Sequence, residues 1–290
     1  MPTTPTAPRE VEGILLSHLK TWPGDGAVAL TGATAVAAGG RVERWVACAG
    51  SCERPFPWAS VTKLLVSLAC LVAVEEGTLD LDEPAGPPGS TLAHLLAHAS
   101  GLPFDGSVPL VPPGRRRIYS NTGAEIAAEL LEERSGMAFA DYLYAGALEP
   151  LGMSATALRG SPAHGAQGPL GDLVRLAGEL LSPSLIGQPT WRRATTVAWP
   201  GLAGVVPGFG RQDPCDWGLG PEIRGNKSPH WTGLTNSPST YGHFGQSGSF
   251  LWVDPAAGVA MVGLSSTPFG PWAKGAWPSL SDAVLAAITT

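Results

Sequence analysis

The chain has 290 residues, of which 44% are hydrophobic and 14% are charged, and its formal net charge is −6. This length and composition predict a folded globular protein with a substantial core and exclude an intrinsically disordered chain. The negative charge argues against a nucleic-acid partner. The basic run "GRRRIY" at 114–119 is interpreted as a solvated loop rather than an anion site.

The N-terminus and the longest apolar run bear on location. The stretch "MPTTPTAPREVEG" lacks the basic start, apolar stretch and small-residue cleavage site of a secretory signal. The longest apolar run, "LLVSLACLVAV" at 64–74, is much shorter than the about 20 residues that cross a bilayer. The sequence therefore predicts a cytoplasmic protein without a membrane partner.

In chain order, "REVEGILLSHLKTW" carries apolar residues at helical spacing and predicts a first helix. The segment "GAVALTGATAVAAGGRVERWVACAG" then predicts short strands joined by a turn at Gly39–Gly40. The run from Ser60 to Glu76, followed by Gly77 as a C-cap, predicts a long helix. The segment "STLAHLLAH" predicts a short helix capped by Ser90.

The second half of the chain changes from helices to loops and strands. An amphipathic helix is expected over 121–136, and further helices are expected over about 138–148, 169–181 and 188–198. Residues 200–240 are rich in Gly, Pro and Trp and predict a long loop region with a strand near "DWGLG". Residues 243–266 predict strands broken by a turn, and "SLSDAVLAAIT" predicts a final helix.

Strands at both ends with helices between them predict an α+β fold. One antiparallel sheet, built from both chain ends and flanked by helices, would carry a mostly helical insertion. The predicted boundaries are 9–59 with 205–290 for the discontinuous sheet domain and 60–204 for the helical domain. Active sites tend to lie between such lobes, so the site is expected in that cleft.

A serine and a lysine three residues apart stand at the start of the long apolar helix, at Ser60 and Lys63. A helix start offers free N–H groups that stabilise negative charge, and positions i and i+3 share one helix face. Burial in an apolar helix lowers the pKa of a lysine, so Lys63 could accept the serine proton. The same S-x-x-K spacing recurs at Ser17, which is predicted to lie on a polar surface stripe and is set aside.

Two further motifs complete a set suited to acyl transfer. "YSN" at 119–121 stands immediately before a predicted helix, and "HFGQSGS" at 243–249 opens a predicted strand. Together with the serine and the lysine they supply a nucleophile, two candidate bases, an amide and a glycine that permits close backbone approach.

In this order the three motifs resemble the penicillin-recognising serine hydrolases, which comprise class C β-lactamases, D-alanyl-D-alanine carboxypeptidases and β-lactamase-like esterases. "ASVTKLL", "VEEGTLDLDEP", "LLAHASGLP", "PPGRRRIYSNTG", "LEPLGM" and "YGHFGQSGS" also resemble recurring segments of that family. The resemblance covers most of residues 55–265 and implies the β-lactamase/transpeptidase-like fold.

The resemblance also implies a role for each motif residue. Ser60 would be the acylated nucleophile, Lys63 its base, and Tyr119 a proton shuttle that serves as base or as acid to the leaving group. Asn121 would hold Lys63 and the substrate carbonyl side through hydrogen bonds, while Ser120 is secondary. The choice between Lys63 and Tyr119 as the main base stays open.

The strand at 243–246 would line the cleft. The backbone N–H groups of Ser60 and Gln246 would form the oxyanion hole. Further cleft candidates are Gly245 and three tryptophans that could line an apolar acyl pocket, with core packing as the alternative for each: Trp58, Trp217 and Trp231.

The third motif begins with His243, where many β-lactamases have a lysine. A lysine is a fixed cation suited to a substrate carboxylate, whereas histidine is mostly neutral near pH 7. His243 is therefore expected to take part in catalysis in a way that favours carboxypeptidase-like or esterase-like chemistry over efficient β-lactam hydrolysis. A structural strand histidine is the alternative.

Histidine and cysteine pairs do not form a convincing metal site. His94 and His98 are one helical turn apart but lack an evident third ligand. Cys48 and Cys52 are close in sequence without further ligands nearby, and a disulfide between them is possible but unnecessary. No metal and no organic cofactor are expected.

The sequence therefore predicts a serine hydrolase that acts through an acyl-enzyme on small esters or amides. Alternatives within the class are a carboxypeptidase, a β-lactamase or a biosynthetic acyltransferase. An alternative of another class is a sensor of the same fold that is acylated once or never. The expected partner is a small-molecule ester, amide or lactam.

Overall fold

The computed structural model describes residues 8–36 and 42–289. The helices are α1 (Pro8–Leu19), α2 (Thr62–Glu75), α3 (Leu92–Leu96), α4 (Asn121–Ser135), α5 (Phe139–Leu143), α6 (Leu170–Leu181), α7 (Gln188–Ala194) and α8 (Pro271–Thr289), with a 3-10 turn η1 (Ala59–Val61) and a π-helical turn η2 (Tyr144–Leu148). The strands are β1 (Gly26–Val36), β2 (Val42–Gly50), β3 (Phe56–Pro57), β4 (Ala157–Leu158), β5 (Ala166–Gly168), β6 (Gly204–Val206), β7 (Gly210–Gln212), β8 (Glu222–Ile223), β9 (Tyr241–Gly245), β10 (Ser249–Asp254) and β11 (Val259–Ser265).

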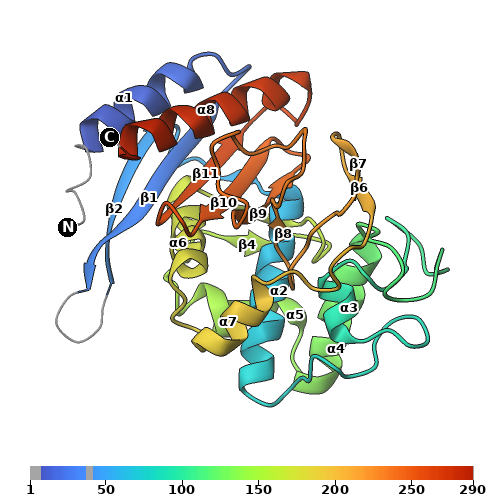
Figure 1. Cartoon of the computed structure of the whole chain (residues 1–290). Coiled ribbons are helices and arrows are strands. Elements are labelled where there is room, and N and C mark those ends of the chain that lie inside the picture. Colours follow the sequence, from blue (N-terminus) through green and yellow to red (C-terminus); the bar gives the residue numbers. More distant parts are fainter. Residues whose placement is uncertain (1–7, 37–41, 290) are drawn as a thin grey trace.

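One six-stranded antiparallel sheet joins the two ends of the chain, in the order β2-β1-β11-β10-β9-β8 (Figure 1). β1 pairs with β11 over the full length of the latter, so strands from opposite chain ends lie side by side. The mixed α+β fold with a sheet from both ends is thereby confirmed. The predicted turn at Gly39–Gly40 lies outside the described residues.

The two faces of the sheet bury different helices. Along β10, Phe250 and Trp252 pack with α1 and α8, whereas Leu251 and Val253 point to the opposite face and to the main core. This alternation follows from the two-residue side-chain period of a strand. Helix α6 covers that second face. Helix α6 belongs to the segment 60–204 that was predicted as the helical domain, yet it packs against β1, β10 and β11 of the sheet.

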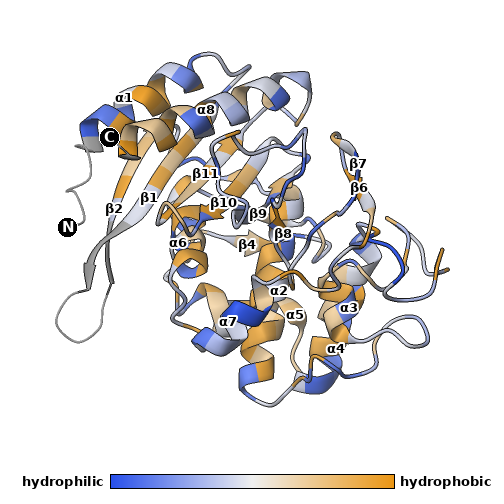
Figure 2. Cartoon of the chain, in the orientation of Figure 1, coloured by the Kyte–Doolittle hydropathy of each residue, from blue (hydrophilic) through white to orange (hydrophobic). Residues whose placement is uncertain are grey.

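Helix α2 runs through the main core, where it is apolar over most of its length (Figure 2). Its residues from Thr62 to Ala73 are all buried. Full enclosure explains why this helix lacks an apolar stripe and a polar stripe, as expected for a central helix. Ser60 and Lys63 lie at its N-terminal end, where the helix meets β9.

Two local predictions required correction. Helix α3 begins after Thr91 rather than at Ser90, because the Thr91 N–H donates to Nδ1 of His94 and closes a capping box. The region from 200 to 240 is not only loop, since β6 and β7 form a short hairpin and β8 joins the main sheet. By contrast, the predicted end of α4 is confirmed by Gly136 in the left-handed conformation.

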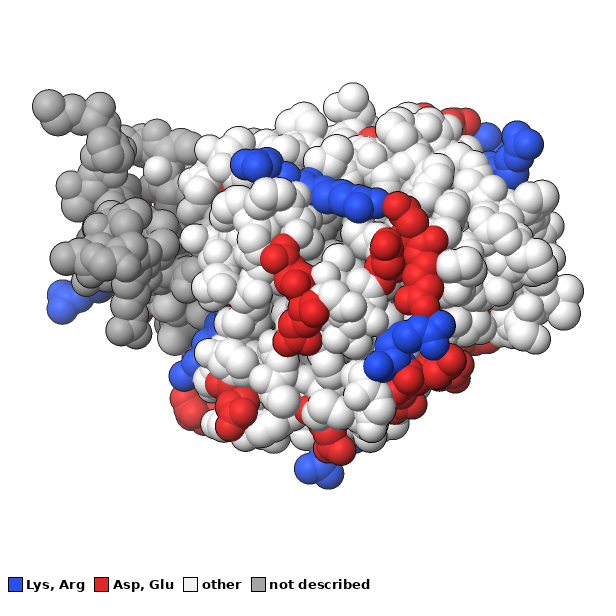
Figure 3. Space-filling view, turned by 90° about the horizontal axis from the view of Figure 1, so that it is seen from below, with Lys and Arg blue, Asp and Glu red and all other residues white. Residues whose placement is uncertain are grey.

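The surface seen in Figure 3 carries Lys and Arg beside Asp and Glu in short groups, separated by uncharged areas. No continuous basic surface is present on that face. Within residues 8–36 and 42–289, no helix is both long and apolar enough to cross a membrane.

Candidate active site

Ser60 lies in the 3-10 turn that leads into α2, and Lys63 lies in the first turn of that helix. The residue before the serine, Ala59, has φ +44°, a left-handed backbone conformation that is uncommon for residues with a side chain. Such strain often marks a functional turn. Gly245 permits β9 to approach, because a Cβ there would stand 2.4 Å from the Trp58 carbonyl oxygen.

Lys63 is buried, with 3% of its surface exposed, and no carboxylate forms an ion pair with it among the described residues. Its Nζ lies 2.7 Å from Asn121 Oδ1, 2.9 Å from the Ala163 carbonyl oxygen and 3.3 Å from Ser60 Oγ. Burial lowers the pKa of Lys63 to about 7, although the more distant Glu125 and Asp105 oppose this shift.

These contacts fit a neutral amine. A neutral lysine has two N–H donors and one lone pair. Asn121 Oδ1 and the Ala163 carbonyl oxygen accept the two protons at the shorter distances. The lone pair is then left for the Ser60 hydroxyl, so the arrangement suits removal of the serine proton.

Asn121 is oriented by two contacts. Its Oδ1 accepts from Lys63, and its Nδ2 donates to Oδ1 of Asp105 at 3.1 Å. Asp105 lies in the loop before α4 and is exposed. The carboxylate can only accept from the amide, so it keeps the amide oxygen directed at Lys63.

Tyr119 stands over the lysine, with Lys63 Nζ 4.8 Å from the centre of its ring. Its hydroxyl is buried and has no hydrogen-bond partner among the described residues. Burial raises the pKa of Tyr119 above its usual range, which the nearby Ser60 hydroxyl partly opposes. The ring packs against those of His98, Trp217 and His243, with centroids 4.7, 5.9 and 5.6 Å away.

His243 on β9 is held as a neutral ring in one tautomer. Its Nδ1–H donates to the Phe244 carbonyl oxygen at 2.7 Å, so Nε2 carries the lone pair. Burial, and then the charge of Lys63, lower the pKa of His243 to about 4. Nε2 is buried and finds no partner in the described parts of the chain.

These side chains surround one cavity of about 120 Å³. It is lined by Ser60, Phe104, Tyr119, Val206, Pro207, Trp217, Glu222, His243, Phe244 and Gln246. The structure thus brings together three separate segments of the chain, which carry Ser60, Tyr119, and His243 with Gln246. Lys63 and Asn121 lie behind this wall, in contact with each other.

Four predicted cleft residues lie outside the lining: Gly245, Trp58, Trp231 and Ser120. Trp58 is fully buried and its Nε1 donates to the Gly168 carbonyl oxygen, while Trp231 is buried and donates to Glu222 Oε2. Ser120 caps α4 by accepting from the Gly123 N–H. Of the three tryptophans, only Trp217 lines the cavity.

A buried ionic cluster beside the cavity was not predicted. Glu222 lies at its centre, with Oε1 3.3 Å from Lys227 Nζ and 3.2 Å from His230 Nε2, and with Oε2 accepting from Trp231. Despite burial, these partners lower the pKa of Glu222 to about 2. No short sequence motif indicates this cluster, because its members lie within residues 200–240, which the sequence predicts to be mainly loop.

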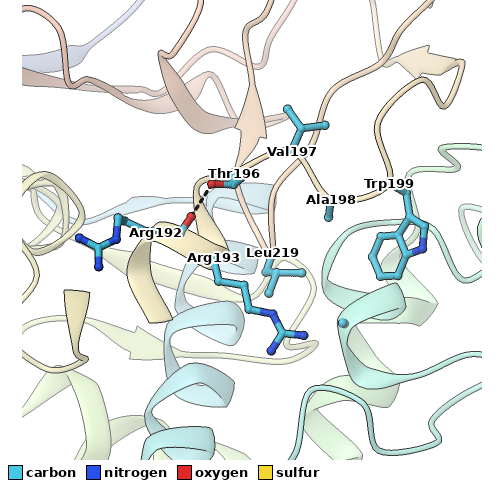
Figure 4. Close-up of a pocket in the computed structure, with 8 residues that line it drawn as sticks. Arg192, Arg193, Thr196, Val197, Ala198, Trp199 and Leu219 are labelled. Carbon is cyan, nitrogen blue, oxygen red and sulfur yellow. Dashed lines mark hydrogen bonds between the residues drawn. The ribbon is translucent and has the colours of Figure 1, made fainter. Parts of the chain in front are cut away.

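A second hollow of about 370 Å³ lies between α7 and α3 (Figure 4). It is lined by Ala93, Arg192, Arg193, Thr196, Val197, Ala198, Trp199 and Leu219. Although this hollow is larger, its walls pair no nucleophile with a base. We therefore take the cavity around Ser60 as the candidate active site.

The other predicted candidates have structural partners. His94 accepts from Thr91, and His98 Nδ1 accepts from the Ser120 N–H, which supports the backbone beside Tyr119. All four cysteines are free thiols. In the part of the chain that the structure describes, no group of three or more His, Cys, Asp or Glu could hold a metal ion.

The mixed α+β fold and the cluster of Ser60, Lys63 and Tyr119 can be compared with known protein families. The family model "Beta-lactamase" matches residues 23–284, so the chain belongs to the β-lactamase family. A solved structure of a β-lactamase from Mycobacterium bovis is 49% identical, with a TM-score of 0.89 over 98% of this chain and all of that one.

More distant relatives share parts or the fold alone. Penicillin-binding protein 4* of Bacillus subtilis is 28% identical over 134 residues, which span 35% of this chain and only 30% of that protein. Simvastatin synthase from Aspergillus terreus shares the fold, with a TM-score of 0.75, at 18% identity over 96% of this chain and 98% of that one.

Proposed function

We propose that the protein is a serine hydrolase that cleaves small neutral esters or amides through an acyl-enzyme. The observation that carries this proposal is the position of the buried Lys63, 3.3 Å from the Ser60 hydroxyl; its close partners among the described residues are neutral, and its pKa is about 7. A lysine in this state can act as a general base near neutral pH.

In the first half of the reaction Ser60 Oγ attacks the carbonyl carbon of the substrate. The serine proton moves to Lys63 as the new C–O bond forms, and the carbonyl oxygen becomes negative. The backbone N–H groups of Ser60 and Gln246 would stabilise this charge. When the bond to the leaving group breaks, Tyr119 gives its proton to the departing oxygen or nitrogen and regains one from Lys63.

In the second half a water molecule attacks the acyl-enzyme. Its proton passes to the neutral Lys63, directly or relayed through Tyr119, the bond to Ser60 Oγ breaks, and the serine regains that proton as the carboxylic acid leaves. Tyr119 and His243 line the same cavity, and each presents a buried polar atom that has no hydrogen-bond partner within residues 8–36 and 42–289. A reacting group or water between them would satisfy both atoms.

β-Lactam hydrolysis is the second candidate, because the 49% identical structure from Mycobacterium bovis is called a β-lactamase. The neutral ring of His243 favours hydrolysis of neutral esters over hydrolysis of β-lactams. A buried lone pair at Nε2 offers no charge complement to the carboxylate of a penicillin, whereas it accepts a hydrogen bond from a neutral group.

Intact-protein mass spectrometry tests the proposal. The protein is exposed briefly to p-nitrophenyl acetate and, separately, to benzylpenicillin, while product release is followed. We expect acetylation with continuing release, abolished by Ser60→Ala and unaffected by Ser17→Ala in the other S-x-x-K stretch. An adduct with benzylpenicillin alone would favour β-lactam hydrolysis as the function. A lasting adduct without product release would favour a sensor, and no adduct with either compound would contradict the proposal.

A further inference from the structure

Exposed apolar side chains gather at the mouth of the catalytic cavity. Phe104, Leu110 and Val205 are 51%, 65% and 49% exposed, and they make up three of the nine large hydrophobic side chains that are exposed in the described part of the chain. They come from two segments far apart in sequence, the loop before α4 and the β6–β7 hairpin, which lie side by side (Figure 1).

Between these segments runs a groove of about 250 Å³. Its lining is Phe104, Leu110, Arg116, Arg117, Ile118, Tyr119, Val205 and Pro207. Phe104, Tyr119 and Pro207 also line the catalytic cavity. The groove is therefore a continuation of that cavity toward solvent.

The groove wall offers mainly apolar surface. The guanidinium of Arg117 is turned to backbone carbonyl oxygens of Ala97, Ala198 and Cys215, so its charge is satisfied within the protein. Arg116 is the remaining charged lining residue and is exposed. An apolar occupant would remove Leu110 and Val205 from water without burying an unpaired carboxylate.

We propose that this groove binds an apolar leaving group, the alcohol part of an ester, during the reaction at Ser60. This inference rests on the proposed function. Tyr119 is the reason for assigning the alcohol part of the ester, rather than the acyl part, to the groove. This residue lines both the cavity and the groove, and it would donate the proton to the leaving oxygen. An alkoxy group departing beside Tyr119 has its chain directed between Phe104 and Pro207 into the groove.

Burial of the alcohol chain should raise kcat/KM. Each methylene group taken from water into the groove is expected to increase kcat/KM about fourfold until the groove is filled. We would compare a series of acetate esters of primary alcohols from methanol to octanol with p-nitrophenyl esters of acids of the same lengths. Only the alcohol series should show the full increase.

Leu110→Ser and Val205→Ser test the wall directly. Both side chains are about half exposed or more, so both variants should fold. We expect them to flatten the dependence on alcohol length while methyl acetate is hydrolysed as before. Leu234→Ser is the matched control, because Leu234 is 81% exposed and lines neither the groove nor the cavity.

A binding measurement separates this inference from the hydrolase proposal. Calorimetric titration of Ser60→Ala with 1-octanol needs no turnover, and we expect binding that Leu110→Ser weakens severalfold. Octanol binding without ester hydrolysis by the unchanged protein would sustain the groove and overturn the proposed function. A length dependence confined to the acyl series, no effect of either groove variant, or a change in oligomeric state caused by them would overturn the groove assignment.

Discussion

Two buried lysines beside the same cavity show what separates a reactive amine from a structural one. Lys63 and Lys227 are 3% and 4% exposed, and each places Nζ near three oxygen atoms. These oxygen atoms differ in charge. Lys227 contacts the Glu222 carboxylate and two backbone carbonyl oxygens, whereas Lys63 contacts an amide oxygen, a carbonyl oxygen and the Ser60 hydroxyl.

The difference follows from the cost of burying a charge. An ammonium group without a counter-charge is destabilised by desolvation, and its pKa falls until the amine loses its proton. Lys63 is in this situation and has a pKa of about 7. The carboxylate beside Lys227 supplies the missing charge, and the reciprocal effect lowers the pKa of Glu222 to about 2. One lysine can exchange a proton near neutral pH, and the other holds a loop in place.

The largest expected effect is the loss of the reactive amine. Lys63→Met should lower kcat/KM for p-nitrophenyl acetate by about a thousandfold, the size typical of a lost general base. In the unchanged protein kcat/KM should rise with pH through about 7, because the neutral form of Lys63 is the active one. Stopped-flow acylation rates between pH 5 and 9 measure both.

Lys20→Met is the control, since Lys20 is exposed in the other S-x-x-K stretch. It should leave the rate and the pH profile unchanged. Retention of most activity by Lys63→Met would assign the role of main base to Tyr119.

The next effect is on stability at the structural lysine. Glu222→Gln leaves Lys227 buried without a counter-charge, so the free energy of unfolding should fall by about 3–5 kcal/mol at pH 7. The folded pKa of Glu222 is about 2, below its unfolded value of about 4.3. Its stabilising contribution is therefore present above about 4.3 and lost as pH falls through about 2, so the gap between variant and parent should narrow in acid.

Urea unfolding of the variant, the parent and Glu129→Gln measures this difference. Glu129 is exposed on α4, so its substitution should change little. The double variant Glu222→Gln with Lys227→Met should recover part of the loss, because it removes the uncompensated charge. A single variant as stable as the parent would show that the ion pair contributes nothing.

The contrast between the two lysines also explains what the sequence could predict. Lys63 could be proposed from the sequence because Ser60 stands three residues before it at the start of a predicted helix, and helical periodicity places both on one face. Tyr119 and His243 could be proposed from short motifs at the starts of predicted elements. The fold followed from strands at both ends with helices between, as the pairing of β1 with β11 confirms.

The Glu222 cluster could not be predicted in the same way. Its members are joined through space across a segment of short strands and turns without periodicity. Trp58 and Trp231 were expected as cleft candidates, but a tryptophan in sequence does not show whether its ring meets a ligand or a carbonyl oxygen. The Asp105 contact with Asn121 likewise depends on how one loop folds back.

A moderate effect is expected when a cation is added beside Lys63. His243→Lys would place a second amine in the cavity, and the repulsion between like charges should shift the rise of kcat/KM toward lower pH. It would also offer a charged hydrogen bond to a substrate carboxylate, worth about 1.5 kcal/mol or more. Acylation by benzylpenicillin, relative to p-nitrophenyl acetate, should therefore increase about tenfold. His243→Gln, which stays neutral, should show neither change, and equal ratios in both variants would argue against a charge-based preference.

The smallest effect is expected at the support of Asn121. Asp105→Ala removes the acceptor that keeps the amide oxygen directed at Lys63, and the loss of one hydrogen bond of about 0.5–1.5 kcal/mol should lower kcat/KM about two- to tenfold. It also removes a negative charge that raises the pKa of Lys63, so the rise of activity should move to lower pH. Asp105→Asn keeps an acceptor without the charge, so it should restore the rate while retaining the pH shift.

Asp141→Ala, at an exposed position on α5, is the control. A pH profile that stays in place in both Asp105 variants would show that this carboxylate does not act on Lys63, and the proton affinity of the amine would then follow from burial and the charge of Glu125.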